Sequence, residues 1–397
     1  MKRFFAIALV LLLCGVMFVG ADDAKVMPAG IGRFYVAPTF GFANNYFNED
    51  GESKSYASGA GSMQLFNLGF ALEYGIIDWI TAALQWAPGW NAWSDVDTVA
   101  LGPDNDINAN GVADLFLGAK LQFIGNQGLV ENDMVRLALA PGVKIPLPGP
   151  DFEEQWNNVS DPANKDPVTP ANIDKHVLGA GARLYFDYVI NEKFFINLYS
   201  EFIGYPVKGD IFKSGINAYA AEGIAKGGLI GQIDLAALGG LIAAPQQAAL
   251  TSLVQGTKII DGGTVDYGYD LTFELEPAFS TSIAEATVFS AGLPFNFKLS
   301  PAKKHSIDIA SDFDTVVTAF AALQPGLDDI VKKQIEDGLN GKGDPSYVFS
   351  LKPNVSIFFM GWALPTEFKV SYSAPLAGKN GDALHTITMQ IKLYFKI

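Results

Sequence analysis

The sequence predicts an all-β fold, a transmembrane antiparallel β-barrel of about 12 strands, with 14 as the alternative, and with helical outer loops. Three observations predict it: an export signal at the start, long stretches of alternating apolar and polar residues, and links between them that are short and long in turn. Apolar residues make up 49% of the chain, yet no segment after the first 21 residues is typical of a transmembrane helix. Only helices and closed barrels satisfy every backbone polar group in lipid, so a barrel remains.

Residues 1–21 are typical of a cleavable signal peptide. Lys2 and Arg3 supply the positive start, an apolar stretch runs over 4–18, and small residues precede the predicted cleavage after position 21. The apolar stretch is short for a membrane span, which needs about 20 residues. We therefore expect residues 22–397 to form the mature barrel.

Cys14 raises the alternative of a lipid-modified N-terminus. Lipid attachment would require a small residue just before the cysteine, and Leu13 stands there. If the signal is cleaved after Ala21, the mature chain has no cysteine and is not a disulfide scaffold. The net charge is −15, which argues against nucleic acid and anionic membrane surfaces as partners.

The segment 383–397 shows the strand pattern most clearly. From His385 onward its odd-numbered positions are almost all apolar, while its even-numbered positions carry Thr, Gln, Lys and Tyr. This period of two is typical of a strand with one face in lipid and one toward a polar lumen. The same pattern predicts eleven further strands, at 31–42, 63–75, 78–88, 112–124, 133–147, 175–190, 193–206, 264–282, 285–299, 345–360 and 363–375.

The links between these strands differ in length. Those at 76–78, 191–193, 283–284 and 361–362 are tight, and those at 43–62, 89–111, 148–174, 207–263 and 300–344 are long. Short periplasmic turns and long outer loops characterise outer-membrane barrels, and an even strand count puts both termini in the periplasm. Fourteen strands would result if part of 300–344 paired. The alternative is a soluble β-sandwich, but the tryptophans near strand ends suit membrane interfaces better.

Two of the long loops are predicted to contain short helices. Residues 215–256 are rich in Ala and Leu, and apolar residues recur at helical spacing in 313–339. Such apolar helices would pack on each other, fill the lumen or line a ligand groove; a simple cap on the barrel mouth is the alternative. The candidate substrate-contacting residues are Ile224, Leu229, Ile230, Leu235, Leu238, Leu241 and Phe320.

One motif suggests a weak structural calcium site, and no other cofactor is expected. Asp106, Asn108, Asn110 and Asp114 occupy positions 1, 3, 5 and 9 of an EF-hand-type loop. Position 12 is Leu117 where a glutamate belongs, and a turn rich in Asn, Asp and Gly is also what a hairpin prefers. Because the three histidines stand isolated from acidic and nucleophilic partners, no catalytic residue and no enzyme activity are predicted.

The predicted lumen is mixed in charge. The inward-facing charged residues are expected to be Arg33, Glu73, Lys120, Arg136, Arg183, Glu201, Asp270, Glu274, Lys369 and Lys392. Such charges either pair across the lumen and narrow it or line a water-filled path, and both interpretations stay open.

Two stretches resemble the FadL/TodX-like superfamily of outer-membrane transporters, including its phenol-degradation group. Residues 110–120 resemble that superfamily's Gly-x-x-Asp-x-x-Leu-Gly-x-Lys strand, and 74–81 resemble one of its turn-strand runs. The resemblance implies import of hydrophobic molecules such as long-chain fatty acids or aromatics. It also implies an N-terminal hatch in the lumen, for which about ten residues before the first strand are too few. We expect loop 215–256 to replace the hatch.

We therefore expect a channel for hydrophobic small molecules in the outer membrane of a diderm bacterium. A general diffusion porin for small polar solutes is the first alternative, and a surface adhesin or structural barrel is the second. The expected partners are outer-membrane lipid, a hydrophobic ligand and the barrel-assembly machinery; nucleic acid is not expected. Tyr394-Phe395 near the C-terminus resembles the C-terminal signal that this machinery recognises.

Overall fold

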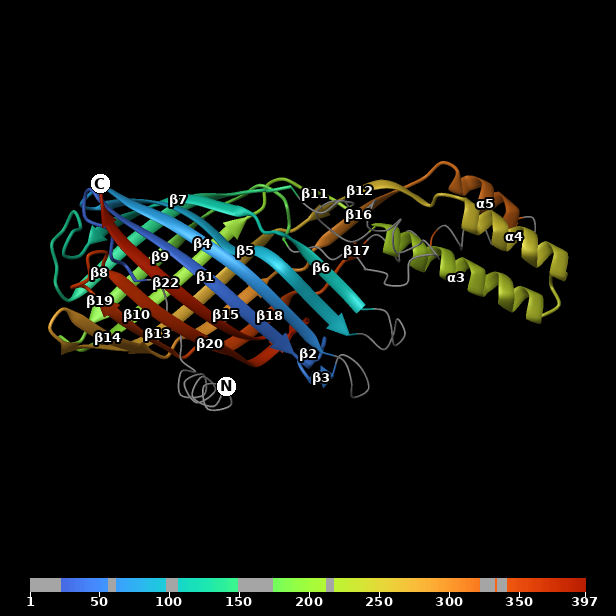
Figure 1. The fold of residues 1–397 in the computed structure, drawn as a ribbon. Helices are drawn as coiled ribbons and strands as arrows, with labels where there is room; N and C mark the ends of the chain where they lie inside the picture. The colour runs from blue at the N-terminus through green and yellow to red at the C-terminus, as the bar shows by residue number, and fades with distance from the viewer. Residues whose placement is uncertain are drawn as a thin grey trace.

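The structure, a computed structural model, describes residues 23–55, 62–97, 106–148, 174–211, 218–321, 333 and 341–397. The predicted signal peptide lies outside these residues. The main body is an antiparallel barrel (Figure 1). Ten of its strands are continuous: β1 (Ile31–Ala43), β4 (Met63–Ile77), β5 (Ile80–Asp97), β7 (Leu115–Ile124), β8 (Val135–Ile145), β9 (Gly179–Val189), β10 (Phe194–Gly204), β13 (Tyr269–Ala284), β20 (Thr366–Lys379) and β22 (His385–Lys396).

Two further barrel strands are each interrupted by a proline. The first consists of β14 (Thr287–Gly292) and β15 (Phe295–Ser300), and the second of β18 (Ser346–Leu351) and β19 (Asn354–Phe359). Pro294 and Pro353 stand at the breaks, because proline has no N–H to donate to a ladder. The barrel thus has the predicted twelve strands, and the two segments expected to be unbroken strands are divided.

The barrel closes where its first and last strands meet. β22 pairs with β1 from Ile31 opposite Lys396 to Phe42 opposite His385. Residues 300–344 add no barrel strand in the part that the structure describes; β16 (Lys304–Ile309) and β17 (Gly341–Lys342) join a separate small sheet. The twelve-strand prediction is confirmed, and the fourteen-strand alternative is wrong for the described residues.

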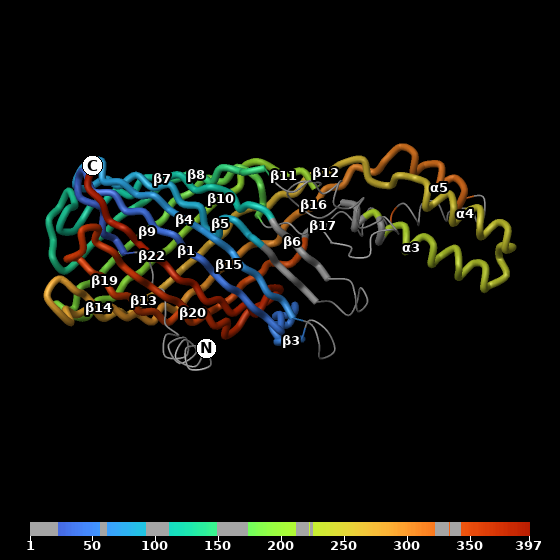
Figure 2. The backbone as a smooth tube through the Cα atoms, viewed as in Figure 1, coloured from blue at the N-terminus to red at the C-terminus, as the bar shows by residue number. Residues whose placement is uncertain are grey.

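The two ends of the barrel differ. The chain trace shows the C-terminus at the end where the tight turns lie, with the helices beyond the opposite end (Figure 2). The short strand β6 (Asp106–Val112) extends the pairing of β5 at the helical end. A small sheet of β2 (Asn45–Phe47), β3 (Ser53–Ser55) and β21 (Gly381–Asp382) also forms there. This is the arrangement of short turns and long loops that the sequence predicts.

The barrel wall is apolar outside and polar inside. Leu72 is exposed while its neighbour Glu73 is buried, and the same alternation relates Met389 and Ile391 to the half-buried Gln390 between them. Exposed apolar side chains are favourable only in contact with lipid over so large a surface.

The residues that the structure describes between β10 and β13 and within 301–344 build a separate projection that we call the arm. Its sheet is β11 (Gly209–Asp210), β12 (Ile260–Asp266), β16 and β17; its helices are α3 (Ala218–Leu238), α4 (Ala244–Gly256) and α5 (Phe313–Ala321). The predicted helices are confirmed in the described part of both loops. Among the described residues, no helix combines the length and hydropathy needed to cross a membrane.

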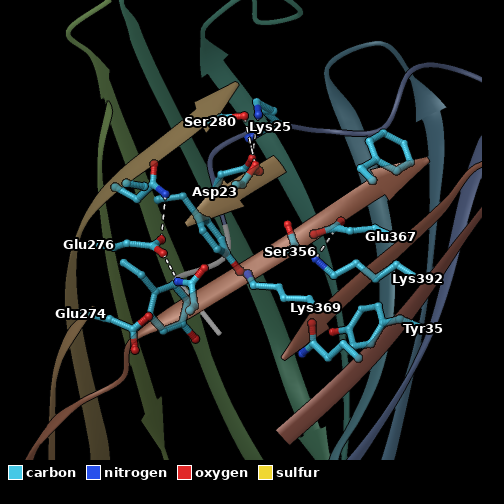
Figure 3. Close-up of a pocket in the computed structure, with 18 of the residues that line it drawn as sticks. Asp23, Lys25, Tyr35, Glu274, Glu276, Ser280, Ser356, Glu367, Lys369 and Lys392 are labelled. Atoms are coloured by element: carbon cyan, nitrogen blue, oxygen red, sulfur yellow. Dashed lines mark hydrogen bonds and ion pairs between the residues drawn. The ribbon is translucent and has the colours of Figure 1, made fainter. Parts of the chain in front are cut away.

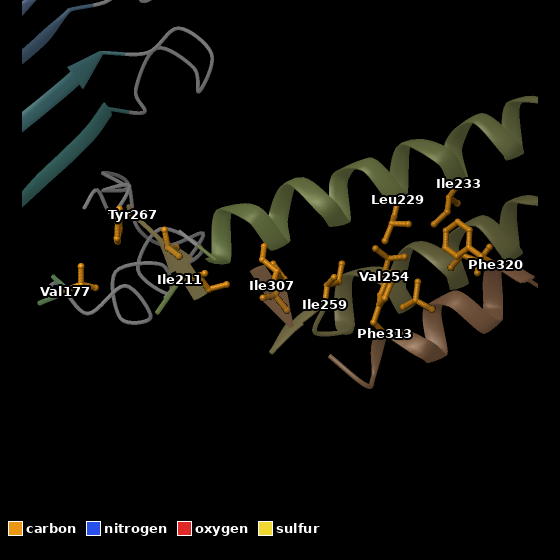
Figure 4. Close-up of a cluster of buried hydrophobic side chains, with 14 of the residues drawn as sticks. Val177, Ile211, Leu229, Ile233, Val254, Ile259, Tyr267, Ile307, Phe313 and Phe320 are labelled. Atoms are coloured by element: carbon orange, nitrogen blue, oxygen red, sulfur yellow. The ribbon is translucent and has the colours of Figure 1, made fainter. Parts of the chain in front are cut away.

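The arm has its own apolar core. Buried side chains of the three helices, such as Leu229, Val254 and Phe313, continue into those of the small sheet, such as Ile260 and Ile307 (Figure 4). The same cluster reaches the barrel mouth through Val177 and Tyr205 and the lumen through Phe116. The arm is therefore packed onto the barrel by a continuous apolar column.

Candidate functional site

The lumen of the barrel contains a cavity of about 670 Å³. Figure 3 shows Glu274 and Glu276 on one wall and Lys369 and Lys392 on the facing wall. The first wall is β13, and the facing wall consists of β20 and β22. The remaining lining includes four tyrosines, three asparagines and three serines, together with further charged side chains. The cavity is therefore polar and mixed in charge, as the alternation of the strands predicts.

Residues 23–29, which we call the N-terminal segment, run along the inner wall of the barrel. The Ala24 N–H lies 3.1 Å from both carboxylate oxygens of Asp187. The side chain of Gln122 donates to the Ala24 carbonyl at 2.8 Å. Met27 N–H donates to the Thr81 hydroxyl at 2.7 Å. Its backbone is thus bonded to side chains of three different strands.

Lys120 fastens the same segment from β7. Its ammonium donates to the carbonyls of Asp23, at 2.8 Å, and Lys25, at 3.4 Å, and stands 4.0 Å from the ring centre of Tyr185. Ala24 is fully buried between this ring and small residues of β8. Although too short for the hatch that the resemblance implies, the N-terminal segment occupies part of the lumen, which the sequence analysis did not anticipate.

A row of charged side chains crosses the inner wall. Arg33 donates to Glu73 at 2.9 Å through Nε, and Gln85 donates to the other oxygen of Glu73 at 3.2 Å. Arg183 bonds to the Gln85 carbonyl oxygen and, at 2.5 Å, to Glu201. Mutual pairing of these groups offsets the cost of taking them out of water. Structural pairing, one of the two open interpretations of the luminal charges, therefore applies to this row.

The guanidinium of Arg183 stacks on the ring of Phe116. The carbon at the centre of that group lies 3.8 Å from the centre of the Phe116 ring, a distance typical of a cation–π contact. The ring lies over Gly118 and Gly142, where an added Cβ would collide with it. Two glycines on adjacent strands thus make room for an aromatic side chain inside the barrel.

Glu274 and Glu276 of β13, which we call the acidic wall, accept hydrogen bonds from asparagine side chains. Glu276 accepts hydrogen bonds from Asn197, at 2.9 Å, and from Asn354. Glu274 accepts one from Asn296 at 2.8 Å and one from Lys352 at 3.3 Å. On the facing wall Lys392 pairs with Glu367 at 3.2 Å. These contacts fix the side chains around the open space of the cavity.

The segment before β9 ties the barrel rim together. Asp174 accepts from Lys144 at 2.8 Å and from the Asp114 N–H at 3.0 Å. Burial opposes ionisation of Asp174, but the charge and hydrogen bond of Lys144 outweigh it and lower its pKa. On the next residue, Lys175 pairs with Asp270. This segment therefore links the rim at β7 and β8 to the start of β13.

The predicted lumen residues separate into three places. Arg33, Arg183, Glu274, Lys369 and Lys392 line the cavity itself. Glu73, Lys120 and Glu201 lie in the paired networks of the inner wall, and Arg136 lies 3.5 Å from Asp187 beside the N-terminal segment. Asp270 lies at the mouth, where Tyr205, Ser300 and Lys175 bond it.

The predicted substrate-contacting residues also separate. Leu229 and Phe320 are buried in the core of the arm, and Ile230 packs against that core. Leu235, Leu238 and Leu241 are strongly exposed at the α3–α4 end of the arm; the side chain of Ile224 lies outside the described part. Because Leu229 and Phe320 are buried in the core, the exposed leucines are the part of this set that a solute can reach.

Most of the predicted calcium-binding motif lies in a β-strand and not in a loop. Residues 106–112 form β6, and Asp114 bonds to the Leu147 N–H at 3.3 Å and stands 3.4 Å from His176. In the described part of the chain no group of three or more His, Cys, Asp or Glu residues is placed to hold a metal. Calcium at Asp106, Asn108, Asn110 and Asp114 stays a prediction.

Several site residues escaped the sequence analysis. Asn197 and Asn354 were not singled out, although their positions face the lumen in the alternating pattern. Asp23 and Lys25 precede every strand and carry no periodic signal. The alternating pattern could have identified these two asparagines as inward-facing. Nothing in the sequence indicates that the N-terminal segment enters the lumen.

Comparison with one solved structure shows the same fold. The COG4313 outer membrane channel from Pseudomonas putida F1 matches with a TM-score of 0.54 at 12% identity, over 95% of this chain and 100% of that one. The toluene transporters TodX of P. putida (TM-score 0.39, 8% identity, 95% and 93% covered) and TbuX of Ralstonia pickettii (0.36, 8%, 94% and 90%) also match. No protein-family model and no curated protein sequence matches the chain.

Proposed function

We propose that this chain is an outer-membrane channel that takes up hydrophobic small molecules, such as long-chain fatty acids or aromatic compounds, in a diderm bacterium. The observation that carries the proposal is the apolar arm beside the mouth of a closed barrel. Its exposed end presents Leu235, Leu238 and Leu241, with the Leu238 side chain 86% exposed. An apolar solute gains free energy by leaving water for such a surface.

Further features of the barrel support this function. The barrel shares its fold over 95% of the chain with an outer membrane channel, and its lipid-facing exterior suits that membrane. The N-terminal segment narrows the lumen, which a general diffusion pore would not require. The alternating last strand, ending near Tyr394-Phe395, supports recognition by the barrel-assembly machinery.

The proposal is tested by uptake into proteoliposomes that contain the full mature chain. A Leu235→Ser, Leu238→Ser, Leu241→Ser triple variant removes the apolar end without touching the arm core, and Val207→Ser, also exposed, is the control. We expect uptake of oleate or toluene to fall several-fold in the triple variant and in a chain lacking 215–256, and to persist in the control. Unchanged uptake in both variants would contradict the proposal.

Diffusion of small polar solutes is a second candidate, favoured by the charged and amide-rich lining of the cavity. It predicts swelling of liposomes in sugar or amino-acid solutions at rates that fall with solute size. Swelling that is independent of the arm, without uptake of hydrophobic solutes, would favour this candidate over the first.

A further inference from the structure

The ion pairs of the lumen differ in which partner they expose. In the Lys352–Glu274 pair the lysine side chain is 34% exposed and the glutamate 7%. In the Lys25–Asp23 pair the corresponding values are 49% and 30%. The arginine side chain is likewise more exposed than its carboxylate partner in the Arg33–Glu73 and Arg136–Asp187 pairs. Lys392 and Glu367 are nearly equal, and Arg183 is less exposed than Glu201.

On the wall formed by β13, asparagine side chains cover the carboxylates of Glu274 and Glu276. Glu276, with 3% of its surface exposed, directs its carboxylate oxygens at Asn197 and Asn354. Glu274 likewise points an oxygen at Asn296. Amide donors bonded to a carboxylate cover its oxygens and satisfy their lone pairs. A mobile ion in the cavity therefore meets little of this negative charge directly.

Among the luminal ion pairs compared above, Lys25 and Lys352 are the cations with the most exposed side chains. Lys25 belongs to the N-terminal segment, and Lys352 stands at the proline break between β18 and β19; both line the cavity. The negative charge of Asp23 is the main cause that raises the pKa of Lys25, so this ammonium stays charged at neutral pH. The exposed charge of the cavity is thus mainly positive, in a chain whose net charge is −15.

We propose that the lumen prefers anions over cations, with Lys25 and Lys352 as the residues that determine this preference. The inference rests on the channel function proposed above and adds to it the sign of the charge that the polar path accepts. Rings and clusters of lysine or arginine favour anions because they lower the energy of an anion in a narrow, partly dehydrated space. Small organic carboxylates and inorganic anions share the required chemistry.

The test is the reversal potential of the full mature chain in planar bilayers under a roughly tenfold potassium chloride gradient, with the lower side near 0.1 M to limit screening to about 10 Å. We expect chloride to permeate about threefold better than potassium in the parent protein and the ratio to approach one in Lys25→Gln, Lys352→Gln. Lys25→Arg, Lys352→Arg should keep the preference. Lys258→Gln, which removes an exposed charge of the arm, should not change it.

The outcomes separate this inference from the channel function. A potassium preference in the parent protein, or a chloride preference that survives loss of both lysines, overturns the inference and leaves uptake of hydrophobic molecules intact. Absence of any ion conductance also overturns it, and the proteoliposome experiment then decides the channel function alone. If Lys25→Gln frees the N-terminal segment, the total conductance rises but the permeability ratio still falls.

Discussion

At the scale of single residues, the inner wall depends on glycines that leave room for neighbours on adjacent strands. An added Cβ at Gly142 would overlap the Phe116 ring and the Leu117 carbonyl, and Arg183 stacks on that ring. Strand alternation identified Arg183 as luminal, but no pattern identified the glycines, because their role depends on which strands are paired and in which register.

Gly142→Ala is expected to destabilise the barrel by about 1–3 kcal/mol, since the displaced ring also displaces Arg183. The matched control is Gly227→Ala on α3, where an added Cβ meets nothing within 4 Å and alanine is the better helix former. Urea unfolding in detergent or lipid, followed by tryptophan fluorescence, measures both. Equal stability of the two variants would show that Phe116 is not held in this way.

Asp174 makes the stability of the rim depend on pH. Its pKa is lowered from 3.8, so its contribution is present above pH 3.8 and is lost as the pH falls through the lowered value. Asp174→Asn should cost about 1–3 kcal/mol at pH 7, because Lys144 loses its charged partner. The cost should shrink toward zero in strong acid. Urea unfolding at both pH values measures it, with Asp133→Asn in an exposed turn as the control.

At the scale of elements, the segments with a regular apolar–polar period were the ones that the sequence could predict. The strands were predicted because lipid on one side and water on the other impose a period of two over a whole strand. The arm helices were predicted by composition, but their separate small sheet was not; two of its four strands, β11 and β17, have only two residues each. The N-terminal segment was missed because Lys120, Gln122 and Asp187 hold it from strands distant in sequence.

Loosening the N-terminal segment should open the lumen. Lys120→Met removes both hydrogen bonds to the carbonyls of the N-terminal segment and the contact with Tyr185. We expect a higher and more variable single-channel conductance, because the segment then spends part of its time away from the wall. Lys54→Met, an exposed lysine outside the barrel, is the control. Identical conductance traces for Lys120→Met and the parent would mean that the segment does not limit the path.

At the scale of the whole molecule, the protein is a closed twelve-stranded barrel with an apolar exterior, a polar and partly filled lumen, and an apolar arm at one mouth. The fold was predictable because membrane insertion restricts the options to very few. The character of the site was less predictable, since luminal charges pair across strands whose register only the folded barrel defines.

Cysteine scanning of β22 tests this description most directly, because its residues should alternate between lipid and water. Single cysteines at Ile387, Met389, Ile391 and Leu393 should react with a lipid-soluble maleimide and resist a charged one. Those at Thr388, Gln390 and Lys392 should be protected from the lipid-soluble reagent, and the cavity-lining positions 390 and 392 should react with the charged one. Reaction of both sets with the charged reagent alone would contradict the membrane barrel.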